Sequence, residues 1–284
     1  MRSRVTAWAA VVVVVAVGLL VVDRDTLATT GDQVAGNPLP LVAALVAYTV
    51  AFALRAEAWA PFLPIAVPWG RRVRALFAML AVNHALPGPV GELARARVVS
   101  GPDLPMRQAL LSVVAARVVD VASIAVLLLG GALVAGELPN WARIAAPAGV
   151  VLPATAFGIA RRRGASVTGQ QAARSVLWAV PSWALECFVL LTVAHAAGIE
   201  LSVGAALLAT CAGVLAQVAA VLPGGVGTYE AGVTSALVVL GVPVGPALAV
   251  AASTHLIKFA YAFAVGIPAL LVRDRAPRTT AVPA

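Results

Sequence analysis

The sequence predicts an all-α, polytopic integral membrane protein with about eight membrane segments in a single domain, residues 1–284. Of the 284 residues, 61% are hydrophobic and 11% are charged, whereas soluble domains contain about 45–50% apolar and about 25% charged residues. Apolar runs follow one another along the whole chain with short connections. Because one crossing of the bilayer takes about 20 apolar residues, we expect no separate soluble catalytic domain.

The membrane segments are predicted from these apolar runs. The first run follows Arg2 and Arg4 and has features of a signal peptide, but everything downstream is also apolar. We therefore interpret it as a retained anchor. The runs cover residues 7–22, 39–54, 75–86, 109–135, 144–160, 176–197, 203–222, 231–240 and 246–272.

The run at residues 75–86 is too short to cross the bilayer. It rises about 18 Å at about 1.5 Å per residue, and the segment at residues 92–100 rises less, against a hydrocarbon core of about 30 Å. The sequence PGPVGE separates the two segments. We therefore predict that they form a re-entrant helical hairpin, which returns to the side from which it entered.

The basic residues predict the orientation of the chain. If the first hairpin returns, sixteen of the 20 Lys and Arg residues, Arg55 among them, fall on one side of the membrane. Arg24 and Arg143 fall on the other side, and Arg117 and Lys258 lie inside apolar runs. Cytoplasmic loops carry an excess of Lys and Arg. We expect a multi-pass protein of the inner (plasma) membrane with both termini in the cytoplasm.

Two glycine-rich interruptions resemble each other, PGPVGE at residues 87–92 and PGGVGTYE at residues 223–230. Interrupted apolar segments at corresponding places in two halves are typical of inverted repeats, with a binding site between the halves. The first half would cover residues 1–135 and the second residues 144–284. Because the run at residues 203–222 is long enough to cross, the sequence leaves open whether the second interruption is re-entrant or joins two full spans.

Both interruptions have the chemistry of an anion site. Pro and Gly end the incoming helix, and the helix that restarts exposes about four unpaired N–H groups where its dipole favours negative charge. Helix starts at Gly91 and Gly227 could therefore hold a phosphate. Glu92 and Glu230 lie in the first turns. Either each carboxylate caps its own helix, or the two gate or protonate a polar cavity.

Four ionisable residues lie deep inside the apolar runs. Arg117 is ten residues after Arg107, which places it about 15 Å along its helix and near mid-membrane depth. Asp120 follows one turn later, and Glu186 and Lys258 are similarly deep. Arg117 with Asp120 and Glu186 with Lys258 could form buried structural pairs. Alternatively, Arg117 and Lys258 are counter-charges for an anionic head group, since intramembrane ionisable residues are usually functional.

The other chemistry-bearing residues predict no metal site and no cofactor. The histidines lack the spacing of a metal site, Cys187 and Cys211 form no CxxC motif, and no nucleotide-binding motif is present. The basic residues fall between apolar runs rather than on a soluble face, so nucleic acid is not an expected partner. The tryptophans, Trp59 and Trp183 among them, mostly flank apolar runs, which is typical of an interfacial belt.

These motifs resemble the membrane region of lysylphosphatidylglycerol synthases and its stand-alone flippase-like relatives, also called UPF0104 proteins. The resemblance covers essentially the whole chain. It implies a membrane protein that moves lipids or lipid-linked intermediates between leaflets, or that assists enzymes making them. The soluble aminoacyl-transferase domain of the full-length synthases is not expected here, and neither is their activity. The resemblance rests on Asn83, Pro87, Gly88, Gly91, Glu92, Arg95, Arg117, Asp120, Pro223, Gly224, Gly225, Gly227 and Glu230.

The sequence therefore predicts a lipid translocase, whose substrate is an anionic lipid or a polyprenyl-phosphate type of lipid. The predicted substrate-binding residues are those of the resemblance together with Glu186 and Lys258. A membrane-embedded enzyme is the alternative, with Glu92 and Glu230 as acid and base. A non-transporting scaffold for lipid-synthesis enzymes is a third reading. The sequence leaves open whether the protein is a homodimer.

Overall fold

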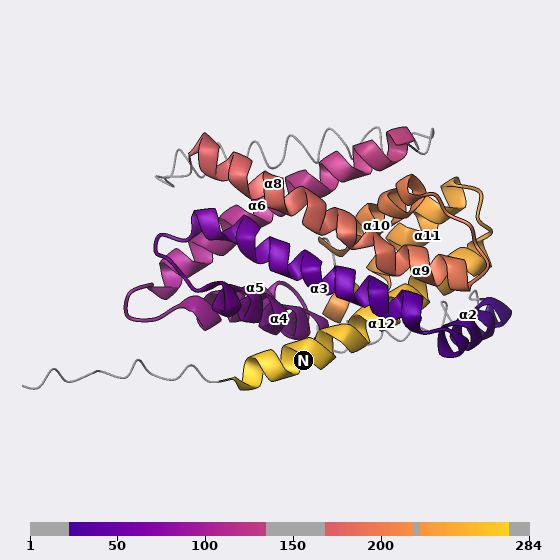
Figure 1. Ribbon diagram of the computed structural model, residues 1–284, viewed down its shortest axis with the longest axis horizontal. Coiled ribbons are helices and arrows are strands. Elements are labelled where there is room, and N and C mark those ends of the chain that lie inside the picture. The colour runs from indigo at the N-terminus through magenta and orange to yellow at the C-terminus, as the bar shows by residue number, and fades with distance from the viewer. Residues whose placement is uncertain (1–22, 135–167, 219–221, 273–284) are drawn as a thin grey trace, which may run out of the picture.

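The computed structural model is an elongated bundle of α-helices, most of which run along the long axis of the molecule (Figure 1). It describes residues 23–134, 168–218 and 222–272. Within these ranges the regular elements are all helical. The predicted runs at residues 7–22 and 144–160 lie outside the described residues. The described part of the chain thus agrees with the predicted all-α class.

Four helical stretches are long and apolar enough to cross a membrane, and they mark the chain as a membrane protein. They have between 24 and 28 residues, which corresponds to about 36–42 Å of helix against a hydrocarbon core of about 30 Å. Their outward side chains are apolar, as at Val46 on α3 and Leu256 on α12. The helices concerned are α3 (Leu39–Trp59), α6 (Met106–Val134), α8 (Gly169–Leu185) continued by α9 (Cys187–Ala196), and α12 (Val244–Leu271).

The third of these stretches is broken, which differs from the single segment predicted at residues 176–197. Helix α8 ends at Leu185, α9 begins at Cys187, and Glu186 lies at the junction. Pro181 lies inside α8, where it lacks the N–H that would continue the hydrogen-bonding ladder. Glu186 itself keeps helical φ and ψ angles of −66° and −26°, and its side chain is buried within the bundle.

A short polar helix, α2 (Arg24–Gly36), precedes α3 and was not predicted from the apolar runs. Asp23 caps it by accepting a hydrogen bond from the amide of Asp25 at 3.1 Å. The hydroxyl of Thr26 donates to the same carboxylate at 2.6 Å and holds the pKa of Asp23 below its usual value. Because hydropathy alone located the predicted elements, a polar helix with a good cap went unnoticed.

The first Pro-Gly interruption forms the tip of a helical hairpin. Helices α4 (Trp69–Ala85) and α5 (Val90–Val99) pack against each other, and both are shorter than the bilayer core, at about 26 Å and 15 Å. Gly88 has a φ of 74° in the turn. A Cβ on Gly91 would overlap the Asn83 side chain, so only glycine lets α5 approach α4 this closely.

The second interruption also forms a hairpin tip. Helix α10 (Val203–Val218) and helix α11 (Thr228–Val239) pack against each other, and their 16 and 12 residues rise about 24 Å and 18 Å. Of the run at residues 203–222, the structure describes residues 203–218 as helical and Leu222 as non-helical, and residues 219–221 lie outside the described residues. The short helix η2 (Pro223–Gly225) forms the tip, with positive φ at Gly224 and Gly225.

The two hairpins enter the bundle from opposite ends and meet in its middle. In Figure 1, α4 and α5 lie toward the left of the view, while α10 and α11 lie toward the right. Helix α4 packs against α12, α10 packs against α6, and η2 contacts α4 directly. Each hairpin is therefore held by the long helix that follows the other hairpin.

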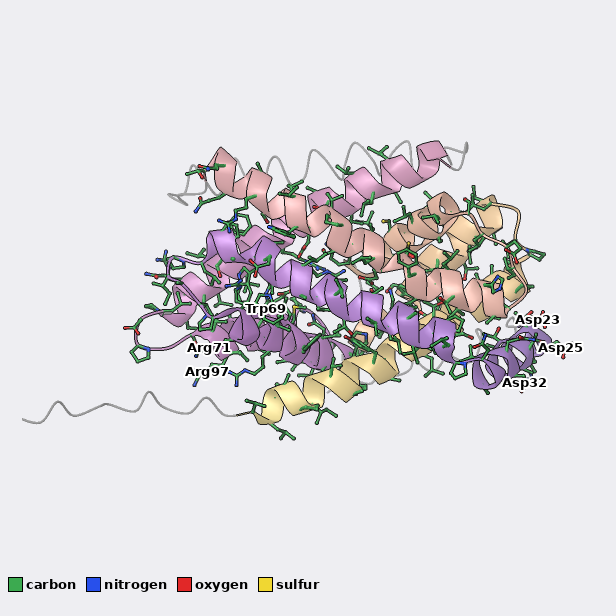
Figure 2. The ribbon with its side chains drawn as sticks, in the orientation of Figure 1. Asp23, Asp25, Asp32, Trp69, Arg71 and Arg97 are labelled. Atoms are coloured by element: carbon green, nitrogen blue, oxygen red, sulfur yellow. The ribbon has the colours of Figure 1, made fainter. Side chains whose placement is uncertain are left out.

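The two ends of the bundle differ in charge. Figure 2 shows Trp69, Arg71 and Arg97 toward one end, and the acidic residues Asp23, Asp25 and Asp32 at the other. The exposed Arg107 follows α5 along the chain, in the first turn of α6. The open end of the first hairpin thus lies at the basic end of the molecule.

We predict that Gly131→Leu lowers the stability of the protein and that Gly130→Leu does not. A Cβ on Gly131 would come within 3.0 Å of the carbonyl oxygen of Gly204 and the amide nitrogen of Leu208, whereas nothing lies within 4 Å of a Cβ on Gly130. Forcing extra atoms into a packed contact costs about 1–3 kcal/mol. Thermal unfolding of the purified protein in detergent measures the difference. Equal midpoints for the two variants would contradict the contact between α6 and α10.

Candidate functional site

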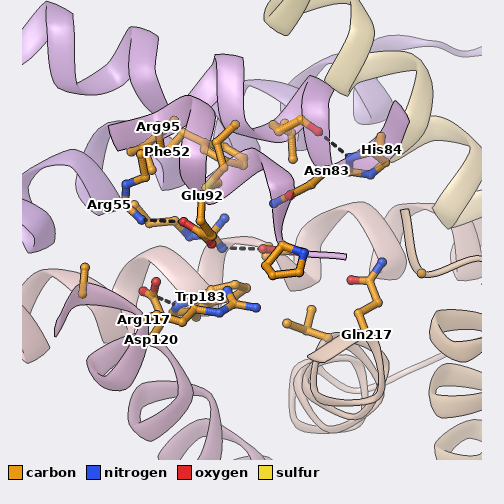
Figure 3. A pocket seen from close by; sticks show the side chains of 18 of the residues that line it. Phe52, Arg55, Asn83, His84, Glu92, Arg95, Arg117, Asp120, Trp183 and Gln217 are labelled. Carbon is orange, nitrogen blue, oxygen red and sulfur yellow. Dashed lines mark hydrogen bonds and ion pairs between the residues drawn. The ribbon is translucent and has the colours of Figure 1, made fainter. Parts of the chain in front are cut away.

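A polar cavity of about 350 Å³ lies where the two hairpin tips meet (Figure 3). Its walls come from α3, α4, α5, α6, α8, α10 and α12, and the second tip contributes Gly224 and Gly225. Seven charged side chains line it, four basic and three acidic, which gives a formal net charge of +1. They are Arg55, Glu92, Arg95, Arg117, Asp120, Glu186 and Lys258.

Glu186 is the centre of a buried ion-pair network. Its Oε1 accepts a hydrogen bond from Nζ of Lys258 at 2.7 Å, and its Oε2 accepts one from Nη2 of Arg55. All three side chains are buried. The Glu186–Lys258 pair is thus the structural pair anticipated from the sequence, and Lys258 is not available as an uncompensated cation in this conformation.

Arg55 was wrongly predicted to orient the chain from a loop. Helix α3 continues to Trp59, so Arg55 lies within the helix, and only 7% of it is exposed. The apolar run ends one residue before Arg55 in the sequence, but the helix does not. The charge therefore belongs to the interior of the protein rather than to the membrane surface.

Two tryptophans that were predicted to lie at the membrane interface instead hold arginines in the cavity wall. The Arg55 guanidinium lies 3.6 Å from the ring centroid of Trp183, and that of Arg95 lies 4.0 Å from the ring centroid of Trp59. The indole of Trp59 donates to Ser112 at 3.1 Å. Such stacking stabilises a desolvated guanidinium, by as much as about 2 kcal/mol.

Arg117 lines the cavity without an ion-pair partner. The predicted pair with Asp120 is not formed, because Asp120 accepts a hydrogen bond from the indole of Trp183 at 3.0 Å instead. Within the described part of the chain, Arg117 makes no hydrogen bond or ion pair. Figure 3 shows its side chain in the cavity beside Asp120 and Trp183. Arg117 is therefore a cation in the cavity wall whose side chain has no ion-pair partner among the described residues.

At the first tip, polar side chains hold the start of α5. The side-chain oxygen of Asn83 accepts a hydrogen bond from the amide of Gly91 at 2.8 Å. Glu92 does not cap the helix; its Oε2 is buried without a hydrogen-bond partner and lies 3.7 Å from Nη1 of Arg95. Asn83 rather than Glu92 thus caps α5, and the Glu92 carboxylate faces the cavity.

At the second tip, Glu230 does cap its own helix. Its Oε2 accepts a hydrogen bond from the amide of Gly227 at 2.7 Å, and its Oε1 lies 2.7 Å from Nδ1 of His255. The contacts of Glu230 agree with the interpretation that it caps its own helix. In this conformation the amides of Gly91 and Gly227 are both used inside the protein, so neither is open to the phosphate that we expected there.

Comparison with known proteins identifies the family. A family model described as the lysylphosphatidylglycerol synthase TM region matches residues 7–170 and 158–266. The chain belongs to this family. The match confirms the resemblance inferred from the sequence. No curated protein and no solved structure was found to match the chain.

In this member of the lysylphosphatidylglycerol synthase TM family, most of the predicted site residues meet at one cavity. Pro87, Gly91, Pro223, Gly227 and Glu230 do not line it, because they form the turns and helix starts behind its wall. Whether the lining residues bind substrate stays a prediction. Those that do line it are Asn83, Gly88, Glu92, Arg95, Arg117, Asp120, Glu186, Gly224, Gly225 and Lys258.

Several lining residues were not predicted from the sequence. Arg55 and Gln217 stand at or inside apolar runs, and polar residues in such positions are the signal that would have found them. His255, one turn before Lys258, was noted only as a poor metal ligand. Within residues 23–134, 168–218 and 222–272, no group of three or more His, Cys, Asp or Glu side chains is placed to hold a metal ion.

We predict that Glu186→Gln strongly destabilises this family member, whereas Glu57→Gln does so only slightly. Removing Glu186 leaves Arg55 and Lys258 buried without an anion, which costs about 3–5 kcal/mol. Glu57 also binds an arginine, Arg72, at 2.6 Å, but its side chain is 30% exposed, and such pairs contribute about 1 kcal/mol or less. Thermal unfolding in detergent compares the two variants.

The double variant Glu186→Gln with Lys258→Met tests the cause of the loss. It should recover part of the stability, because it removes one of the two uncompensated cations. Equal unfolding midpoints for Glu186→Gln and Glu57→Gln would show that the network does not hold the helices together.

Proposed function

We propose that this protein moves an anionic lipid, or an anionic lipid-linked intermediate, between the two leaflets of the membrane. The observation that carries the proposal is Arg117, a cation without an ion-pair partner among the described residues, in the cavity where the two hairpin tips meet. Ionisable side chains at membrane depth are expensive to bury, and they usually mark the path of a substrate or ion. The head group would pass through the cavity while the acyl chains stay in the bilayer.

The size and charge of the cavity fit a head group. Ligand pockets have volumes of about 300–1,000 Å³, and at about 350 Å³ this cavity is at the small end of that range. It is therefore better matched to a head group than to a complete lipid with its chains. The net charge of its lining favours an anion, and a phosphate is the anion that phospholipids and polyprenyl phosphates share.

The packing of the helices supports an inverted repeat, which would comprise residues 1–135 and 144–284. In each half a short hairpin is followed by a long helix, and each hairpin packs on the long helix of the other half. Glycines make both contacts close: Gly266 of α12 lies against Ala81 of α4, and Gly131 of α6 lies against Gly204 of α10. Together with the runs at residues 7–22 and 144–160, this arrangement supports about eight membrane segments, with the site between the halves.

The charge asymmetry supports an orientation with the basic end in the cytoplasm. Trp69, Arg71 and Arg97 lie at that end, and Asp23, Asp25 and Asp32 lie at the other (Figure 2). Because Lys and Arg accumulate on the cytoplasmic side, the first hairpin would enter from the cytoplasm and the second from outside. We place the protein in the plasma membrane, with both termini in the cytoplasm.

The geometry supports transport better than the alternative of an embedded enzyme. An enzyme with Glu92 and Glu230 as acid and base needs both carboxylates on one substrate. Glu92 lines the cavity, whereas Glu230 does not, and both oxygens of Glu230 are engaged by Gly227 and His255. A scaffold that binds only partner enzymes gives no reason for the uncompensated charge of Arg117 in the interior.

We predict that Arg117→Ala slows lipid movement at least about tenfold, because one charge-assisted contact to an anion is worth about 1.5–3 kcal/mol. Arg117→Lys keeps the charge and should retain part of the rate. The purified protein is reconstituted into liposomes that contain a fluorescent anionic phospholipid, and a membrane-impermeant quencher reports how fast the label changes leaflet.

Arg107→Ala is the matched control, since it removes the same charge from the exposed start of the same helix, α6. Its rate should equal that of the unmodified protein. Arg117→Ala with an unchanged rate, in protein that unfolds at the normal temperature, would overturn the proposal. Conversion of the lipid to a new compound would instead support the enzyme.

A further inference from the structure

The tip of the second hairpin is fastened to α12 by a buried histidine. Nδ1 of His255 is 2.7 Å from Oε1 of Glu230. Nε2 of the same ring is 3.1 Å from the carbonyl oxygen of Gly224. Gln217 reaches the same carbonyl from α10, with Nε2 donating at 2.7 Å, and that nitrogen also lies 3.2 Å from Nε2 of His255. The imidazole therefore connects the tip with the first turn of α11.

The two main partners of His255 can only accept hydrogen bonds. A carboxylate and a peptide carbonyl carry no hydrogen to donate, and a neutral imidazole has a single N–H. If Nδ1–H donates to Glu230, the lone pair of Nε2 faces the lone pairs of the Gly224 oxygen and can accept only from Gln217. A doubly protonated imidazole donates to Glu230 and to Gly224 at once. One proton thus replaces the hydrogen bond from Gln217 by a charge-assisted hydrogen bond to Gly224, and it removes the repulsion between the two lone pairs.

Groups from three helices surround His255 and affect whether it binds that proton. From α11 come the Glu230 carboxylate, which favours the charged imidazole, and the Tyr229 ring at 4.4 Å. From α4 comes His84, whose ring centroid is 6.3 Å away. From α12 itself comes Lys258, which shares the single negative charge of Glu186 with Arg55. The charge in direct contact with the imidazole is the negative charge of Glu230.

We infer that His255 and Glu230 form a proton-binding site that latches the second hairpin tip. With the proton bound, His255 holds Gly224 and the tip is fixed. Without it, the Gly224 carbonyl keeps only its hydrogen bond from Gln217, and this part of the tip is released more readily. The tip contributes Gly224 and Gly225 to the cavity wall, so release changes the wall that a head group must pass.

The effect of this latch on lipid movement rests on the proposed function. The binding of the proton and the change at the tip do not. If lipid moves through the cavity, protonation of His255 slows it and deprotonation speeds it. The ligand of the new site is the proton itself, so the transmembrane proton gradient acts on the hairpin that enters from outside. The conformational change at the tip can be measured without any transport assay.

Hydrogen–deuterium exchange of the full chain in lipid nanodiscs measures the latch directly. The amides of Gly225, Val226 and Gly227 are hydrogen-bonded within the tip. We expect their protection to fall roughly tenfold between about pH 5.5 and about pH 8.5, after correction for intrinsic exchange, which is the effect of losing one charge-assisted hydrogen bond.

In His255→Gln this pH dependence should disappear, whereas in the control His195→Gln, an exposed histidine near Glu200, it should persist. Glu230→Gln keeps an oxygen for the Gly227 amide but removes the charge, so the transition should move to lower pH. Constant protection of the tip in the unmodified protein would overturn the latch. A normal transition in His255→Gln or an unshifted one in Glu230→Gln would overturn it as well.

Lipid movement in liposomes, measured over the same pH range, separates the two proposals. A rate that rises with pH in the unmodified protein and is flat in His255→Gln supports both. A pH-dependent tip in protein that moves no lipid at any pH would leave the latch standing and overturn the transport function. Lipid movement with a tip that does not respond to pH would support the transport function and overturn the latch.

Discussion

The interior of this protein depends on one carboxylate that pairs with two cations. Glu186 lies at the break between α8 and α9 and binds Arg55 of α3 and Lys258 of α12. Because a buried charge without a partner is far more costly than a buried pair, these three helices are constrained to meet at one depth. The remaining charges of the cavity are positioned around that fixed point.

The hairpin tips add a second constraint, the need to satisfy their backbone. Where a chain turns at membrane depth, its N–H and C=O groups find no water, and protein groups must pair with them. Asn83 does this for the first tip, and Gln217, Glu230 and His255 do it for the second. Some polar residues that a sequence motif marks as functional therefore form hydrogen bonds with the backbone of the tips. This explains why Gly91, Gly227 and Glu230 lie behind the cavity wall while Arg117 lies in it.

Features that depend on residues close together in the sequence could be predicted, whereas contacts between separate helices could not. The first hairpin, the two glycine-rich interruptions and the family depend on local composition and spacing, and they could be found. Partners between helices could not. Asp120 binds Trp183 of α8 rather than Arg117 three residues away, because the packing of α6 on α8 decides which side chains meet. Arg55 was misjudged since hydropathy marks the end of an apolar run, whereas α3 continues past it to Trp59.

The two tips are alike in sequence but differ in chemistry, and this difference limits what each can do. The first is fixed by Asn83, a neutral amide whose hydrogen bond to Gly91 does not depend on a proton. The second is fixed through an imidazole and a carboxylate, which do. Aromatic rings on α12 lie between the tips: the ring centroid of Phe259 is 4.6 Å from that of His84 on α4 and 4.8 Å from that of His255. Packed rings therefore provide a contact path between the two tips, and the proposed latch lies at the second of them. The asymmetry assigns the responsive role to the hairpin made by α10 and α11, and the anchoring role to the one made by α4 and α5.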